Sequence, residues 1–198
     1  MPGGQGDPPD GGRRRDGHRG GLRRLTHPVA CRLRPARPDD IEALIEAETA
    51  AAKLFGEHGY PQLAEEAPPS PAALEESLDR HDVIVAADDA DRAIGYAMAL
   101  VIGDTYWLCE LSVHPAHGRR GVGTALLSAF LDAARRCGCR RAGLSTFRRV
   151  PFNAPFYARH GFVESGADEA DSALRDRFQR EVPDGIDPSE RVMMLRVL

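Results

Sequence analysis

The chain has 198 residues, 42% of them hydrophobic, and a formal net charge of −4 at pH 7. This length and apolar share suit one globular domain with its own core. No apolar run approaches the roughly 20 residues that a membrane span needs. The Gly- and Arg-rich beginning also lacks the apolar segment of a signal peptide. We therefore expect a cytoplasmic protein with no membrane partner.

The first 29 residues are predicted to form a disordered arm, because Pro, Gly, Arg and Asp dominate and few apolar residues could pack. Its arginines could contact the phosphates of a nucleic acid. No aromatic residues are interleaved with them and no folded nucleic-acid reader is evident, so an inert tail is the preferred interpretation. The folded domain is expected to span residues 30–198.

The four cysteines match neither a zinc site nor a disulfide framework. They are Cys31, Cys109, Cys137 and Cys139. Cys137 and Cys139 form a pair without partner ligands, which is weak evidence for a metal. We expect reduced thiols and no metal.

Apolar periodicity and turn residues predict the following elements in chain order. They are a strand at 31–35, a helix from Pro38 to about Lys53, a loop-rich excursion at 54–72, a short helix at 71–79, two antiparallel strands at 83–87 and 93–101, a central strand at 106–113, a helix at 121–137, a strand at 141–147, a short helix at 153–160, a strand at 162–165, a possible helix at 171–181 and a last strand at 192–198.

The central strand is followed by a glycine-rich turn and then by an amphipathic helix. Pro115 ends the strand by removing a backbone donor. Gly118, Gly121 and Gly123 allow a ligand to approach the backbone closely, and the first amides of the helix point outward with the partial positive charge of the helix dipole. The turn therefore predicts a phosphate cradle.

Two common phosphate-binding motifs do not fit this turn. A P-loop requires Gly-Lys-Ser/Thr, whereas Gly123 is followed directly by Thr124. The dinucleotide fingerprint G-x-G-x-x-G has its glycine spacings in the opposite order, and the chain before Tyr106 does not open a doubly wound domain.

The stretch from Tyr106 to Leu127 instead resembles the acyl-CoA loop of the GNAT family of N-acetyltransferases, Gln/Arg-x-x-Gly-x-Gly/Ala after a strand ending in Val-His-Pro. Gly118 stands where the family usually has Gln or Arg. The run from Leu144 to Phe162 resembles the family's later segment, a strand, an Asn and Tyr-x-x-x-Gly-Phe. The resemblance covers Cys31 to Leu198. It implies an α/β fold with a mixed, mostly antiparallel sheet of six or seven strands, flanked by helices and splayed between strands 4 and 5.

The resemblance also implies a binding site for acetyl-CoA as acyl donor. Backbone amides of the cradle would hold the pyrophosphate, and the end of the central strand would pair with the pantetheine arm. Asn153 would either cap its helix or contact the cofactor, and Phe156 would be core or a wall of the cofactor site. The full set of expected cofactor-binding residues is Leu111, Ser112, Val113, Gly118, Arg119, Arg120, Gly121, Val122, Gly123, Thr124, Asn153 and Phe156.

Two catalytic residues are expected. Glu110 would take the proton that an alkyl amine, with a solution pKa of about 10, must lose before it attacks. Strand alternation places its side chain opposite Cys109 and Leu111. The alternative is a surface carboxylate, with a water chain as base. Tyr157 would stay protonated and donate to the departing thiolate; the alternative is a packing tyrosine. His114 is expected to belong to the turn.

The predicted function is direct transfer of an acetyl group to a primary amine in a ternary complex, without a covalent enzyme intermediate. The alternative is a non-catalytic acyl-CoA-binding regulatory module. In the family the excursion at 54–72 lies over the acceptor pocket, and its carboxylates would suit an amine that is cationic in solution, although a solvated acidic loop is the preferred interpretation. Small molecules and peptides both remain possible acceptors, and a homodimer is possible.

Overall fold

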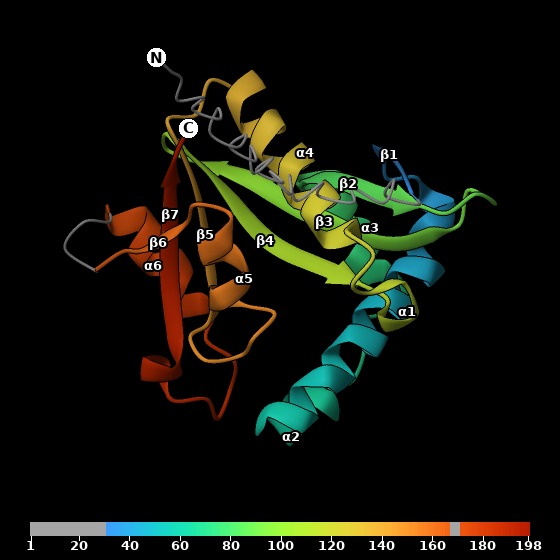
Figure 1. Cartoon of the computed structure of the whole chain (residues 1–198), viewed down its shortest axis with the longest axis horizontal. Helices are drawn as coiled ribbons and strands as arrows, with labels where there is room; N and C mark the ends of the chain where they lie inside the picture. Colours follow the sequence, from blue (N-terminus) through green and yellow to red (C-terminus); the bar gives the residue numbers. More distant parts are fainter. Residues whose placement is uncertain (1–30, 167–170) are drawn as a thin grey trace, which may run out of the picture.

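The computed structural model describes residues 31–166 and 171–198, and the predicted arm at 1–29 lies outside this part of the chain. Its strands form one seven-stranded sheet in the order β1-β2-β3-β4-β5-β7-β6 (Figure 1). The strands are β1 Arg32–Pro35, β2 Asp82–Ala87, β3 Ala93–Ile102, β4 Thr105–Val113, β5 Arg141–Phe147, β6 Val163–Glu164 and β7 Arg191–Val197. The helices are α1 Ile41–Ala52, α2 Pro61–Ala64, α3 Pro71–Arg80, α4 Val122–Arg136, α5 Ala154–Arg159 and α6 Ser172–Arg180. Short 3-10 segments are η1 Pro38–Asp40, η2 Lys53–His58, η3 Pro115–His117 and η4 Pro188–Glu190.

The sheet is mixed and mostly antiparallel, as predicted. Strands β1 to β4 pair antiparallel in sequence order, and β7 pairs antiparallel with both β5 and β6. Only β4 and β5 run parallel among the described strands, because α4 carries the chain back across the sheet between them.

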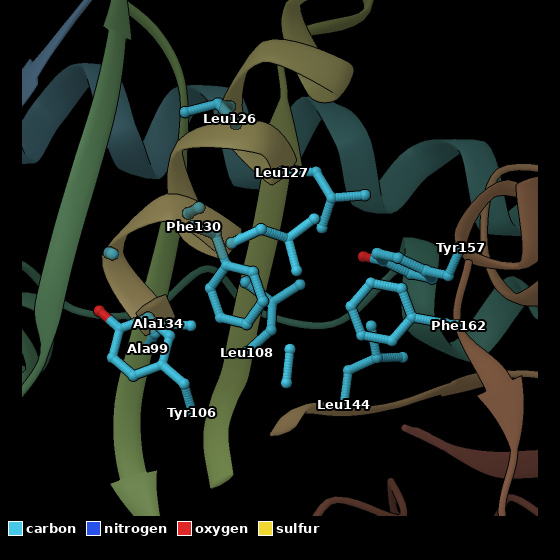
Figure 2. Packing of buried hydrophobic residues seen from close by; sticks show 14 of the residues in the cluster. Ala99, Tyr106, Leu108, Leu126, Leu127, Phe130, Ala134, Leu144, Tyr157 and Phe162 are labelled. Carbon is cyan, nitrogen blue, oxygen red and sulfur yellow. The ribbon is translucent and has the colours of Figure 1, made fainter. Parts of the chain in front are cut away.

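Successive side chains of β4 point to opposite faces of the sheet and pack against different helices. Tyr106 packs with Leu126, Leu127 and Phe130 of α4, and Figure 2 shows this side of the core. Trp107 packs with Leu174 of α6 on the other face. That second face also carries α1 and α3, which bury the Tyr96 ring of β3. The sheet is therefore covered on both sides.

The excursion predicted at 54–72 contains more helix than expected. Residues 53–58 form η2, which stops at Gly59 in the left-handed region with φ +92°. Pro61 then begins the short helix α2, where its missing N–H costs nothing. Aromatic residues hold this segment against the end of β5, since the Phe55 and Tyr60 rings lie 5.3 and 4.5 Å from the Phe147 ring.

The central strands part where the family fold predicts it. Pairing between β4 and β5 runs from Thr105–Arg141 to Leu108–Leu144 and then stops. Beyond that point β4 stays paired with β3 to Val113, and β5 stays paired with β7 to Phe147. Figure 1 shows the two strands diverging. The expected splay between strands 4 and 5 is confirmed.

A β-bulge in β4 changes one prediction. Met98 of β3 pairs with Glu110, but the next residue, Ala99, pairs with Leu108, so Cys109 is an extra residue in β4. Cys109 packs near Trp107, and Glu110 stands opposite Met98, whose side chain packs against the α1 cluster. Glu110 and Cys109 therefore share the α1/α6 face. The expectation that they point to opposite faces was wrong, and only Leu111 lies on the other side.

Candidate functional site: an open strand pair and a helix N-terminus

The first turn of α4 is an uncapped helix N-terminus. Gly121 occupies the N-cap in the left-handed region with φ +85°, and no side chain caps the helix. The amides of Val122, Gly123 and Thr124 therefore have no helical acceptor and carry the positive end of the dipole of a 15-residue helix. Arg119 and Arg120 are exposed beside this turn, with Arg119 also at positive φ (57°). The turn suits an anionic group such as a phosphate.

Gly123 opens toward the gap between the parted strands. A Cβ atom on Gly123 would lie 3.8–3.9 Å from the side chains of Leu111 and Val113 of β4 and Phe156 of α5. These four predicted cofactor-binding residues thus come together around one space, which a side chain on Gly123 would fill. Gly118 has a different task, because its amide donates to the Pro115 carbonyl at 3.0 Å and closes η3.

Glu110 is a half-buried carboxylate next to a second carboxylate. Burial raises its pKa from 4.5 to about 7, and the negative charge of Glu48 on α1 adds to the shift. The Ser112 hydroxyl donates to Oε1 of Glu110 at 2.7 Å and opposes the shift. A carboxyl group with a pKa near 7 is suited to exchange protons at neutral pH. The Ser112 side chain is thus directed at Glu110, and the predicted contact of Ser112 with the cofactor concerns its main chain.

Glu48 is a site residue that the sequence interpretation missed. It accepts a hydrogen bond from the hydroxyl of Tyr96, whose ring is fully buried. The signal was present, because Glu48 lies four residues after Leu44 and four before Ala52, on the apolar stripe of α1. A carboxylate on a buried stripe indicates a polar partner or a functional role.

Tyr157 is buried on the α4 face of the sheet. Its ring packs edge-on against Phe156 and Phe162, with centroids 5.1 and 5.9 Å away, and Figure 2 shows it beside Phe162. Burial raises the pKa of the phenol, and the charge of Glu110 raises it further. The hydroxyl therefore stays protonated at neutral pH, and it has no hydrogen-bond partner among residues 31–166 and 171–198.

Asn153 does not cap its helix with its side chain, so that predicted alternative was wrong. Its Oδ1 accepts instead from the Thr146 hydroxyl at 2.9 Å and from the Phe147 amide at 3.4 Å. These bonds fasten the start of α5 to the part of β5 that has left β4. Asn153 thereby shapes one wall of the open strand pair.

A cavity of about 480 Å³ lies beside the open strand pair, at the end of β5. It is lined by His58, Gly59, Tyr60, Arg149, Val150, Ser189 and Glu190. A hydrogen bond to Glu190 raises the pKa of the Tyr60 phenol. The predicted acceptor excursion therefore does border a cavity. Arg149, Ser189 and Glu190 were missed, because they reach it from distant parts of the chain.

His114 belongs to the turn, as expected. Its Nδ1 accepts from the Ala116 amide at 3.2 Å. With His117 it borders a second cavity, next to α1.

The parted strands and the bare helix N-terminus define a class, the acyltransferases that take their acyl group from coenzyme A. The chain belongs to the acetyltransferase (GNAT) family, whose model matches residues 43–162. It is 38% identical over 103 residues to a mycothiol acetyltransferase of Saccharomonospora viridis, a match that covers 50% of this chain and 31% of the relative. The chain thus spans about a third of that curated relative.

Solved structures share the fold at low sequence identity. PaiA N-acetyltransferase from Thermoplasma acidophilum, in complex with coenzyme A, has a TM-score of 0.61 and 18% identity, over 85% of this chain and 99% of that one. Rv2747 from Mycobacterium tuberculosis, in complex with CoA, has a TM-score of 0.62 and 23% identity, over 84% and 99%.

Three further findings concern metals, thiols and membranes. Within the described residues, no three His, Cys, Asp or Glu side chains are grouped so that they could hold a metal ion. All four cysteines are free thiols. No helix in the described parts of the chain is both long and apolar enough to cross a bilayer.

Proposed function

We propose that this chain transfers an acetyl group from acetyl-CoA directly to a primary amine of a small molecule or peptide. One observation carries the proposal: β4 and β5 part beside a bare helix N-terminus, and Glu110 and Tyr157 flank the opening. Acetyl-CoA would supply the activated acetyl thioester. The amides of residues 121–124 would bind its pyrophosphate, and residues 111–113 would offer the pantetheine arm an unpaired strand edge.

Glu110 would accept the proton of the incoming ammonium group, since its pKa of about 7 leaves it partly ionised at neutral pH. Tyr157 would donate its phenolic hydrogen to the leaving sulfur from the other face of the sheet. Proton acceptor and donor would then lie on different faces of the sheet, and the second proton that the nitrogen loses as the thiol departs would restore the Tyr157 phenol.

The decisive experiment measures thiol release from acetyl-CoA with a panel of amines, for the parent and for Tyr157→Phe. We expect turnover with at least one amine and a loss of kcat of about 10²-fold in the variant, the size typical of one general acid. Calorimetry with acetyl-CoA provides the control, because the variant should bind it as the parent does. Binding without turnover for every amine would instead identify a non-catalytic acyl-CoA-binding module.

A further inference from the structure

Arg191 is a sequestered cation without a counterion. It is the first residue of β7 and pairs with Phe147 of β5. Its guanidinium carbon lies 4.6 Å from the Phe147 ring centroid, and Nη2 donates to the Ser145 hydroxyl at 2.8 Å. Its Nε has no hydrogen-bond partner, and it is the one buried side-chain polar atom of the described residues in that condition.

Arg34 provides a comparison, because it is an arginine with a buried side chain that is ion-paired within the fold. Its side chain is 8% exposed, and it donates to both carboxylate oxygens of Asp40 at 2.7 and 2.8 Å and to Asp91 at 2.8 Å. A sequestered cation is stable when it is paired in this way. Arg191 makes no ion pair with any carboxylate in the described ranges.

The two carboxylates whose negative charges act on Arg191 form hydrogen bonds with other residues. Glu181 accepts from the Trp107 indole at 2.9 Å and from Arg177 at 2.6 Å. Glu110 accepts from Ser112. Both charges act on Arg191 from beyond ion-pair distance, while burial lowers the pKa of the guanidinium. The guanidinium of Arg191 is therefore attracted by carboxylates that it does not touch, and an added carboxylate would give it a direct partner.

The position of Arg191 connects it to the cavity at the end of β5. Its chain neighbours Ser189 and Glu190 line that cavity, as does Tyr60, whose ring packs against the same Phe147 that lies under the guanidinium. The opposite charge, from Glu110 and Glu48, lies across the opening on β4 and α1. At the cavity itself, Arg149 adds a second positive charge and the Glu190 carboxylate is hydrogen-bonded to Tyr60, so this end is positive in sum while the Glu110 end is negative.

We infer that the acceptor amine carries a carboxylate close to its reacting nitrogen, and that Arg191 and the Ser145 hydroxyl bind this carboxylate. The inference rests on the proposed acetyl transfer and narrows its substrate class to amino acids or similar short zwitterions. Arg191 would hold the anionic end, which would direct the ammonium group toward Glu110. Two charge-assisted bonds to one carboxylate also fix its orientation, which a lone cation would not.

The test uses matched acceptors that share one side chain: an amino acid, its amide, and the amine that lacks the carboxyl group. Such triads are prepared for the twenty amino acids, and kcat and KM are measured by thiol release. For the parent we expect the free acid of the accepted triad to exceed both partners at least tenfold in kcat/KM, mainly through a lower KM. Arg191→Gln should remove this preference, whereas Arg191→Lys should keep part of it.

Arg196→Gln is the matched control, because Arg196 lies near the other end of the same strand, away from the cavity, and donates to the His160 carbonyl. It should leave the preference unchanged. If Arg191→Gln lowers kcat/KM equally for all three acceptors of a triad, Arg191 acts at the reacting atoms and the inference is overturned. A parent protein that shows no preference for the free acid would also overturn it. If Arg191→Gln does not fold, Ser145→Ala replaces it, and retention of the full preference in that variant would also overturn the inference.

Failure of the proposed function has a different signature. In that case no amine of any triad releases thiol, although the protein is folded, and both proposals fall together. Turnover with amines that lack a carboxylate, without improvement by the free acid, overturns the substrate class alone and leaves acetyl transfer in place.

Discussion

Glu110 owes its chemistry to its surroundings, and this gives a pH prediction at the scale of one residue. Its pKa of about 7 means that the ionised, proton-accepting form is lost as the pH falls below 7. The kcat/KM of the parent should therefore rise through an apparent pKa near 7. Glu110→Gln should lower kcat/KM by about 10²-fold at pH 7.5 and remove that limb. A variant that keeps the limb would identify another group as the base.

The same shift makes Glu110 a cost to stability at high pH. Its pKa is higher in the folded chain than its ordinary 4.5, so its contribution to stability is fully present below pH 4.5 and is lost as pH rises through about 7. Glu110→Gln should therefore raise the free energy of unfolding at pH 8 by up to about 3 kcal/mol. At pH 4.5 it should change that free energy little. Denaturant titrations at both pH values measure the difference. A variant that is less stable at pH 8 would contradict the assigned cause.

Some residues of the candidate site could be predicted from the sequence, and others could not. Glu110 and Tyr157 were found from motif resemblance, and their catalytic roles stay predictions. Glu48 could have been found from its place on an apolar helical stripe. Arg191 could not, because an arginine at a strand end is ordinary in sequence and becomes unusual only when burial leaves its Nε unpaired.

At the scale of elements, the turn before α4 gives a test of the cradle. A Cβ atom on Gly123 would lie at ordinary contact distances from Leu111, Val113 and Phe156, so a small side chain there suits the folded state and would project into the gap. Gly123→Val should therefore weaken acetyl-CoA binding at least tenfold while shifting the unfolding temperature by only a few degrees. Isothermal calorimetry and thermal denaturation measure the two effects.

Ser128→Val is the control for this substitution. Ser128 lies on the same helix and is exposed, so it receives the same β-branched side chain away from the gap. It should bind acetyl-CoA like the parent. Equal binding by Gly123→Val and the parent would rule out a cofactor path beside Gly123.

Most elements were predictable because their signals are local. The limits of β5 agree at 141–147, and α4 ends before Gly138, which takes φ +72°. The bulge at Cys109 was not predictable, because alternation in one strand carries no information about the pairing of its partner. That one extra residue places Cys109 and Glu110 on the same face of the sheet, whereas regular strand alternation predicts that they point to opposite faces.

At the scale of the whole molecule, the cavity shows why the rest was out of reach. Its lining brings residues 58–60 next to residues 149–150 and 189–190. These segments meet only after β7 has paired with β5 and the excursion has folded back onto Phe147. The family resemblance predicts the sheet, its splay and the region over the acceptor pocket. The charges inside the pocket depend on contacts across more than a hundred residues.

The sheet consists of two halves joined at few points, and this gives a prediction for the whole chain. Within the described residues, strands β1–β4 and strands β5–β7 share only the four parallel pairs from Thr105–Arg141 to Leu108–Leu144. A cofactor seated in the gap would cover the open edges of both halves at once. Acetyl-CoA should therefore slow amide hydrogen exchange at residues 109–113 and 145–147 together, by tenfold or more.

Strand β2 is the internal reference for this measurement, because both of its edges are already paired, with β1 and β3. Its exchange should change little beyond the general stabilisation that any ligand of the folded state produces. Protection confined to the turn at 118–124 would mean that the nucleotide end binds while the pantetheine arm stays outside the gap. The direct-transfer mechanism would then fail, because Glu110 and Tyr157 would have no thioester between them.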